Sequence, residues 1–180
     1  MQMKRLLTIL ILLLLDLTNG FGQISNLELK VDSLQYLKRQ PFACNSTYWH
    51  VVVKGKEVIP FLIDKLDDTT ATEISLTCKP TDVKLGDICF EALTEICSIP
   101  IFYITHLQFD LIDENGCQHG VFNYLANNRQ KFKEQIRVYY EKYKNDLKFI
   151  RYQKDYQNDC KKMNGIFGYY DVDWKLLDKK

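Results

Sequence analysis

Two amphipathic segments joined by a threonine-rich connector constrain the fold of this chain more than any other feature of its sequence. The first segment spans residues 57–66, and Pro60 lies in its first turn. A proline costs little there, because the first amides of a helix have no acceptor within it. The polar residues 67–70 offer the backbone other hydrogen bonds and are typical of a helix end. Its apolar positions recur at helical spacing and share one face: Val58, Phe61, Leu62 and Leu66.

The second segment predicts a helix over residues 82–97. Thr81 is a plausible N-cap, and Asp82 suits the positive end of the helix dipole. Gly86 lowers helix propensity by about 1 kcal/mol relative to alanine, and we expect it to let a neighbouring backbone approach. We expect Asp87 to cap the helix or to bridge to a neighbouring loop, with ligand contact as the second interpretation. The apolar stripe is broad: Leu85, Ile88, Cys89, Ala92, Leu93 and Ile96.

These residues carry a resemblance to a known family. The pattern IPxLIxxLxD from Ile59 resembles the inner helix of a HEAT-type repeat, and VxxGDIxxxALxxI from Val83 resembles the opening helix of the next repeat. The same stretch is similar to small exported bacterial proteins of unknown function that share the pattern GKxxIPxLIxKLxD…GDI. The resemblance covers about a quarter of the chain. It implies short antiparallel helix pairs and protein–protein contact, and no particular activity. The three copies that a solenoid needs are not seen in the sequence.

Residues 1–22 have the pattern of a secretory signal peptide. Two basic residues precede an apolar run over residues 6–15, and small or polar residues follow it. The run is about half of the roughly 20 residues that a membrane-spanning helix needs, which disfavours an anchor. We expect cleavage after Gly20 or Gly22. Residues 23–180 then form a single helical domain, exported to the periplasm or the extracellular space, without a membrane span.

The six cysteines are interpreted in the light of this export signal, because disulfides form in oxidising compartments. Cys89 and Cys97 are eight residues apart on one predicted helix. This separation is about 12 Å, beyond the roughly 7 Å limit for the Cα atoms of a disulfide. We therefore expect both as buried thiols. One or two disulfides are expected among the other four cysteines: Cys44, Cys78, Cys117 and Cys160. Their spacings match no zinc pattern, so we expect no metal and no cofactor.

Apolar spacing in the rest of the chain predicts a mainly α fold. Asn45 is one candidate cap of a helix that carries three valines, and those valines also suit a strand. Asn127 or Asn128 is the candidate cap of a helix that extends to about Lys144. A small C-terminal β-hairpin is the alternative to irregular structure over residues 147–152 and 165–172. The remaining predicted helices span residues 24–37, 101–112 (largely buried) and 121–125.

The charge of the chain gives no support to nucleic-acid binding. Its formal net charge is +1, and nucleic-acid binding needs a basic patch or stripe. The basic stretch 129–154 is interleaved with acidic residues, which is typical of a solvated helix face.

Candidate catalytic groups are few. Paired carboxylates hydrolyse glycosides when a cleft holds them at a defined separation. Asp64, Asp68 and Asp87 are therefore the candidates for a small hydrolase of envelope or extracellular material. His119 follows Cys117 by two residues, but a disulfide is the simpler role for that cysteine.

The aromatic side chains favour a binding function. Tyrosine and tryptophan tolerate half-exposed positions and can contact a partner protein or a glycan. The candidate binding residues are Trp49, Tyr139, Tyr140, Tyr169, Tyr170 and Trp174. Ordinary packing is the favoured interpretation of any one of them. The leading hypothesis is an exported, non-enzymatic interaction module with an unknown protein or glycan partner. A hydrolase and a glycan-binding surface are the alternatives.

Overall fold

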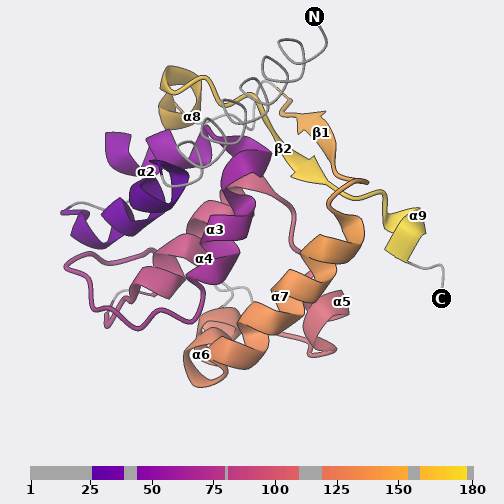
Figure 1. Ribbon diagram of the computed structural model, residues 1–180, viewed down its shortest axis with the longest axis horizontal. Coiled ribbons are helices and arrows are strands. Elements are labelled where there is room, and N and C mark those ends of the chain that lie inside the picture. Colours follow the sequence, from indigo (N-terminus) through magenta and orange to yellow (C-terminus); the bar gives the residue numbers. More distant parts are fainter. Residues whose placement is uncertain (1–25, 39–43, 80, 110–118, 154–158, 178–180) are drawn as a thin grey trace, which may run out of the picture.

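Helices make up most of the regular structure, and a small two-stranded antiparallel sheet accompanies them (Figure 1). The computed structural model describes residues 26–38, 44–79, 81–109, 119–153 and 159–177. The predicted signal peptide lies outside these ranges. None of the helices in the described ranges has both the length and the apolar character needed to cross a membrane.

The predicted helix pair is present at the centre of the fold. The 3₁₀-helix η2 (Gly55–Val58) leads into α3 (Ile59–Asp64), with Pro60 in its first turn, and the connector then leads to α4 (Leu85–Ile96). The two helices pack side by side and run in opposite directions (Figure 1). Their apolar faces meet in a hydrophobic core that extends from Val31 to Val172. A HEAT-like relationship of this pair stays a prediction.

The start of α4 differs from the sequence prediction. Its N-cap is Lys84, not Thr81, so the helix begins three residues after Asp82. The reason is a set of backbone hydrogen bonds between the two ends of the connector. The amide of Leu85 donates to the Thr70 carbonyl at 2.9 Å, and the amide of Thr72 donates to the Val83 carbonyl at 3.1 Å. These bonds hold residues 82–84 outside the helix.

Gly86 lies where α3 and α4 come closest at this end. Its amide donates to the Asp68 carbonyl at 3.1 Å. A Cβ at position 86 would overlap the carbonyl oxygen of Leu66 and lie 2.9 Å from its carbon. The missing side chain therefore lets the end of α3 approach the first turn of α4.

The N-terminal part packs against this pair through α2. Residues 26–32 are α-helical and continue into η1 (Ser33–Tyr36), within the predicted range 24–37. α2 (Ser46–Val52) is a helix rather than a strand, because the Asn45 side chain accepts a hydrogen bond from the Thr47 amide at 3.0 Å and caps it. The predicted apolar positions of the first helix are all buried: Leu27, Val31, Leu34 and Leu37.

The prediction of a long buried helix over residues 101–112 is wrong. α5 (Ile101–Thr105) ends after five residues, because His106 adopts a left-handed conformation with φ 56°. The hydroxyl of Thr105 accepts from the Leu107 amide at 3.2 Å and stabilises this end. Phe102 and Leu107 are exposed rather than buried.

α6 and α7 follow. α6 (His119–Asn127) is longer than the predicted 121–125, and α7 (Arg129–Tyr143) follows Asn128 as expected. The apolar side of α7 faces the core at Phe132, Ile136, Tyr139 and Tyr143, with Tyr140 half-buried.

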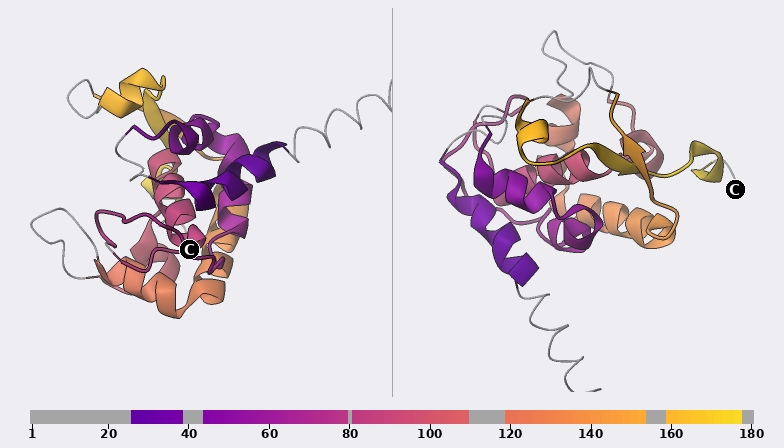
Figure 2. Two further views of the ribbon diagram at one scale, coloured as in Figure 1. Left: turned by 90° about the vertical axis from the view of Figure 1, so that its left-hand side faces the viewer. Right: turned by 90° about the horizontal axis from the view of Figure 1, so that it is seen from above.

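The C-terminal part forms an antiparallel ribbon. β1 (Lys148–Arg151) pairs with β2 (Gly168–Asp171), with Phe149 opposite Tyr170 and Arg151 opposite Gly168. The connection contains α8 (Asp159–Met163), and α9 (Trp174–Leu177) follows β2. The amide of Ser98 donates to the Tyr170 carbonyl at 2.8 Å, which attaches β2 to the end of α4. α8 and α6 lie at opposite ends of the molecule (Figures 1 and 2).

Disulfide bonding follows the sequence prediction where the structure describes it. Cys44, just before α2, is joined to Cys160 of α8, and Cys78 is also disulfide-bonded. Cys89 and Cys97 are buried thiols. Burial raises the pKa of the Cys97 thiol to about 12, so it stays protonated and unreactive at neutral pH. Cys117 lies outside the described residues.

Candidate functional site

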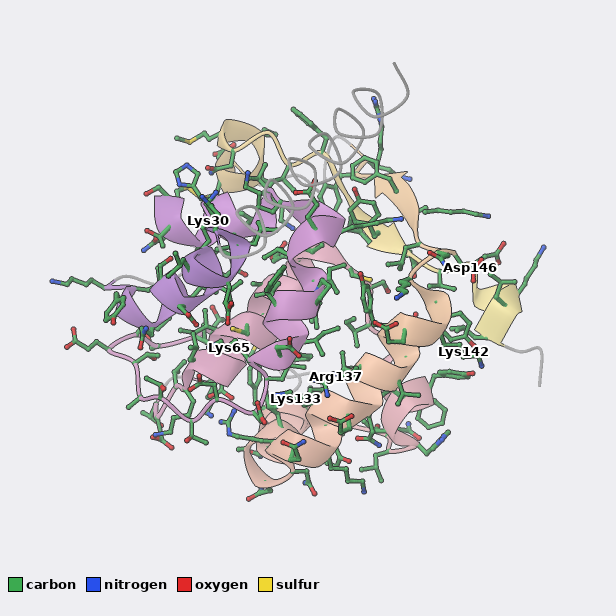
Figure 3. All side chains as sticks on the ribbon, viewed as in Figure 1. Lys30, Lys65, Lys133, Arg137, Lys142 and Asp146 are labelled. Atoms are coloured by element: carbon green, nitrogen blue, oxygen red, sulfur yellow. A yellow bond between two sulfur atoms is a disulfide. The ribbon has the colours of Figure 1, made fainter. Side chains whose placement is uncertain are left out.

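The carboxylates at the end of α3 are held in ion pairs with α7. Asp64 accepts from Arg137 at 2.7 Å, and Asp67 accepts from Lys133 at 2.8 Å. Figure 3 shows Lys133 and Arg137 on the side of α7 that faces α3. Asp68 accepts from the backbone amide of Thr70 at 2.8 Å and shapes the connector. Each of these carboxylates therefore has a local partner at the surface.

Asp87 is a buried carboxylate that joins three parts of the fold, and it is not accessible to solvent. Its carboxylate is fully buried and accepts from Lys79 at 2.5 Å and from Arg129 at 3.0 Å. The backbone amide of Lys84 also donates to it, at 2.8 Å, which caps α4. These contacts join the connector, α4 and the first turn of α7. Asp64, Asp68 and Asp87, the candidate catalytic residues of a hydrolase, thus contact different partners and do not form a pair. Asp87 also has no oxygen that faces solvent.

The aromatic candidates separate into core and surface residues. Trp49 and Tyr139 are 0% and 5% exposed, so they contribute to the core and cannot contact a partner at the surface. Tyr140, Tyr169 and Tyr170 are half-buried. The side chain of Trp174 lies outside what the structure describes. A continuous binding surface made by all six residues is therefore not formed.

A different apolar surface is formed where the ribbon meets the loop after α2. Val53, Phe149 and Phe167 are 46%, 48% and 57% exposed, which is high for large apolar side chains. All three line one hollow of about 170 Å³. We call it the ribbon hollow; Gly55, Gly168 and Tyr170 line it as well.

The β pairing explains why these side chains gather there. Phe149 lies opposite Tyr170 in the ladder, so both point to the same face, with ring centroids 5.4 Å apart in an edge-to-face arrangement. Lys56 lies over the Tyr170 ring at 4.9 Å and fixes it from η2. A Cβ at Gly168 would lie 2.7 Å from the Phe149 ring. Glycine at this position therefore leaves the space that the ring occupies.

The edge of the ribbon hollow is polar. Glu95 of α4 lines it and pairs with Lys161 of α8 at 2.7 Å, and Arg151 lines it from β1. Half-exposed aromatic side chains within a polar rim are typical of protein interfaces. Among the described residues that line the hollow there is no serine, cysteine or histidine. Within the described ranges, no group of three or more histidine, cysteine or acidic side chains is placed to hold a metal ion.

Sequence reasoning missed the residues of the ribbon hollow. Tyr170 was a candidate, but Val53, Phe149 and Phe167 were not. The position of the two phenylalanines depends on a strand pairing between residues about 20 apart. The available signal was the repeated aromatic-glycine pattern around residues 165–170.

Comparisons with known proteins give no relative to which the site can be compared. The chain matches no protein-family model, and searches of curated proteins and of solved structures found no match either.

Proposed function

We propose that this protein is an exported, non-enzymatic interaction module that binds a protein partner through the ribbon hollow. The observation that supports this most is the exposure of Val53, Phe149 and Phe167 around one concave surface. Large apolar side chains that gather at a surface often mark a protein-binding site. Aromatic anchors contribute most of the binding energy at such sites.

Export is the second part of the proposal. The disulfide between Cys44 and Cys160 is stable in an oxidising compartment and uncommon in the cytosol. The sequence of residues 1–22 is typical of a secretory signal. Both features agree with a periplasmic or extracellular location. The ion pairs of Asp64 and the buried ties of Asp87 favour this binding role over hydrolysis by these carboxylates.

Affinity capture with matched variants tests the proposal. The oxidised domain is immobilised and exposed to envelope and extracellular extracts of the source cells. We expect a protein that is retained by the wild type and lost with Phe149→Ser or Phe167→Ser. The control is Val138→Ser, an equally drastic change at a 67% exposed position of α7 that does not line the hollow. Equal retention by all four proteins would contradict binding at the ribbon hollow.

A glycan partner is distinguished in the same experiment. Digestion of the extract with a protease removes a protein partner and leaves glycans intact. If material is still retained after protease digestion, and its retention is lost with Phe149→Ser or Phe167→Ser, the partner is a glycan and not a protein.

A further inference from the structure

A second pocket lies on the other side of the last turns of α4, apart from the ribbon hollow. It has a volume of about 320 Å³. α4 contributes Phe90, Glu91 and Thr94, and α6 contributes Phe122. Ile99 precedes α5, and Ile101 is the first residue of α5. The rings of Phe90 and Phe122 meet edge to face, with centroids 5.8 Å apart. The volume is at the lower end of the range for small-molecule sites.

Glu91 is the only carboxylate that lines this pocket among the described residues. We call the cavity the Glu91 pocket. No hydrogen bond or ion pair reaches the Glu91 side chain from the described part of the chain, in contrast to its neighbours on α4. Asp87, one turn earlier, is paired with Lys79 and Arg129. Glu95, one turn later, is paired with Lys161 at 2.7 Å. The carboxylate at 91 therefore lacks the counter-charge that its two neighbours have.

The apolar surroundings make this charge costly. Burial raises the pKa of the Glu91 carboxyl to about 7, with a further contribution from the negative charge of Glu95. Among the described lining residues, the other titratable side chain is the Cys97 thiol, which stays neutral because burial raises its pKa to about 12. A carboxylate in an apolar site is stabilised by a bound cation, and the cation gains more there than in water.

We propose that the Glu91 pocket binds a small organic amine, with its ammonium group against the Glu91 carboxylate and its apolar body against Phe90, Phe122 and Ile101. A bare metal ion fits less well, because the lining offers one carboxylate and otherwise mostly carbon. An anion is disfavoured by the same charge. Aromatic rings beside the ammonium group add a favourable cation–π contribution. This site is separate from the ribbon hollow and does not depend on the proposed protein partner.

The experiment uses 2-phenylethylamine as the probe and the oxidised full domain as the protein. Binding is followed by two-dimensional amide NMR at pH 8, where Glu91 is ionised. We expect saturable shifts at residues around Phe90, Thr94 and Phe122. The neutral isostere 2-phenylethanol keeps the apolar body and lacks the charge, so we expect it to bind at least about tenfold more weakly. Lowering the pH to 5.5 protonates Glu91 and weakens amine binding by about tenfold or more.

Variants separate the pocket from general surface charge. Glu91→Gln removes the carboxylate with little change in volume, and we expect it to lower the affinity for the amine at least about tenfold. Glu57→Gln removes one exposed carboxylate elsewhere and leaves the affinity unchanged. The comparison of amine with alcohol and the pH series need only the wild type, so they test the site even where a variant folds poorly. The proposal is overturned by equal binding of amine and alcohol, by shifts that map away from the pocket, or by no saturable shift up to about 20 mM amine.

Discussion

Replacing Asp87 with asparagine tests the packing of the central helix pair. The substitution removes the negative charge and keeps nearly the same volume. Lys79 and Arg129 have only 15% and 11% of their side-chain surfaces exposed, so water cannot replace the lost partner. Breaking a buried ion pair by removing one member costs about 3–5 kcal/mol. The asparagine oxygen can still accept from the Lys84 amide, so the cap of α4 is kept. Asp87→Ala loses this cap as well, at a further cost of about 1 kcal/mol.

Urea denaturation of the oxidised protein, followed by circular dichroism, measures this effect. With a slope of about 2 kcal/mol per molar urea, the midpoint of Asp87→Asn is expected to fall by about 2 M. The control is Asp64→Asn, whose ion pair with Arg137 has 60% of the aspartate side chain exposed. Exposed pairs contribute less than about 1 kcal/mol. If Asp87→Asn loses no more stability than Asp64→Asn, the buried ion pairs of Asp87 do not stabilise the fold as argued.

Three further predictions concern stability. Gly86→Ala is expected to lower the free energy of unfolding by about 1–3 kcal/mol, because the new Cβ overlaps the Leu66 carbonyl. Helix propensity alone predicts a gain of about 1 kcal/mol, so a rise in stability measured by urea denaturation would contradict the overlap. The pKa of Glu91 is 4.5 in the unfolded chain and about 7 in the folded protein. Between pH 4.5 and 7 the folded protein therefore keeps a proton that the unfolded chain releases, and the free energy of unfolding falls as the pH rises through this interval. Glu91→Gln lacks this fall, so its advantage over the wild type is expected to be about 3 kcal/mol at pH 8 and near zero at pH 4. Equal pH profiles of the two proteins would contradict this prediction. Replacing Cys44 and Cys160 together with serine opens a loop with a sequence separation of 116 residues and is expected to cost about 4 kcal/mol in thermal or urea unfolding; an unchanged midpoint would show that the bond does not form.

Local patterns predicted the parts of the fold that depend on local interactions. The spacing of Val58, Phe61, Leu62 and Leu66 identifies the apolar face of the segment that contains α3; Phe61 is half-buried and the other three are buried. The same kind of local signal located α7 and the cap at Asn45. Helical periodicity and capping depend on residues three or four apart, so a single sequence contains the whole signal.

The errors arose where the structure depends on a special backbone conformation or on contacts beyond one helical turn. The early end of α5 depends on a left-handed residue, His106, which no apolar pattern reports. The start of α4 depends on hydrogen bonds with the connector. Trp49 was a binding candidate because of its residue type, but it lies in the core. Tertiary packing, and not residue type, decides whether an aromatic side chain is exposed.

The candidate sites were the least predictable part. The two strands were among the expectations, but the register that places Phe149 opposite Tyr170 cannot be inferred from either strand alone. Glu91 lies on α4 outside the predicted apolar stripe, so its partial burial was not expected. Only the position of α6 shows that Phe122 lies across the pocket from it.

Site-specific photocrosslinking tests the central functional claim most directly. A photoreactive phenylalanine analogue replaces Phe167 in the ribbon hollow, or Phe102 on α5 as a control that is 65% exposed. Cells that export the protein are irradiated, and adducts are identified by mass spectrometry. We predict a protein adduct from position 167 that is absent from position 102. The same adducts from both positions, or none from position 167, would contradict a partner bound at the ribbon hollow.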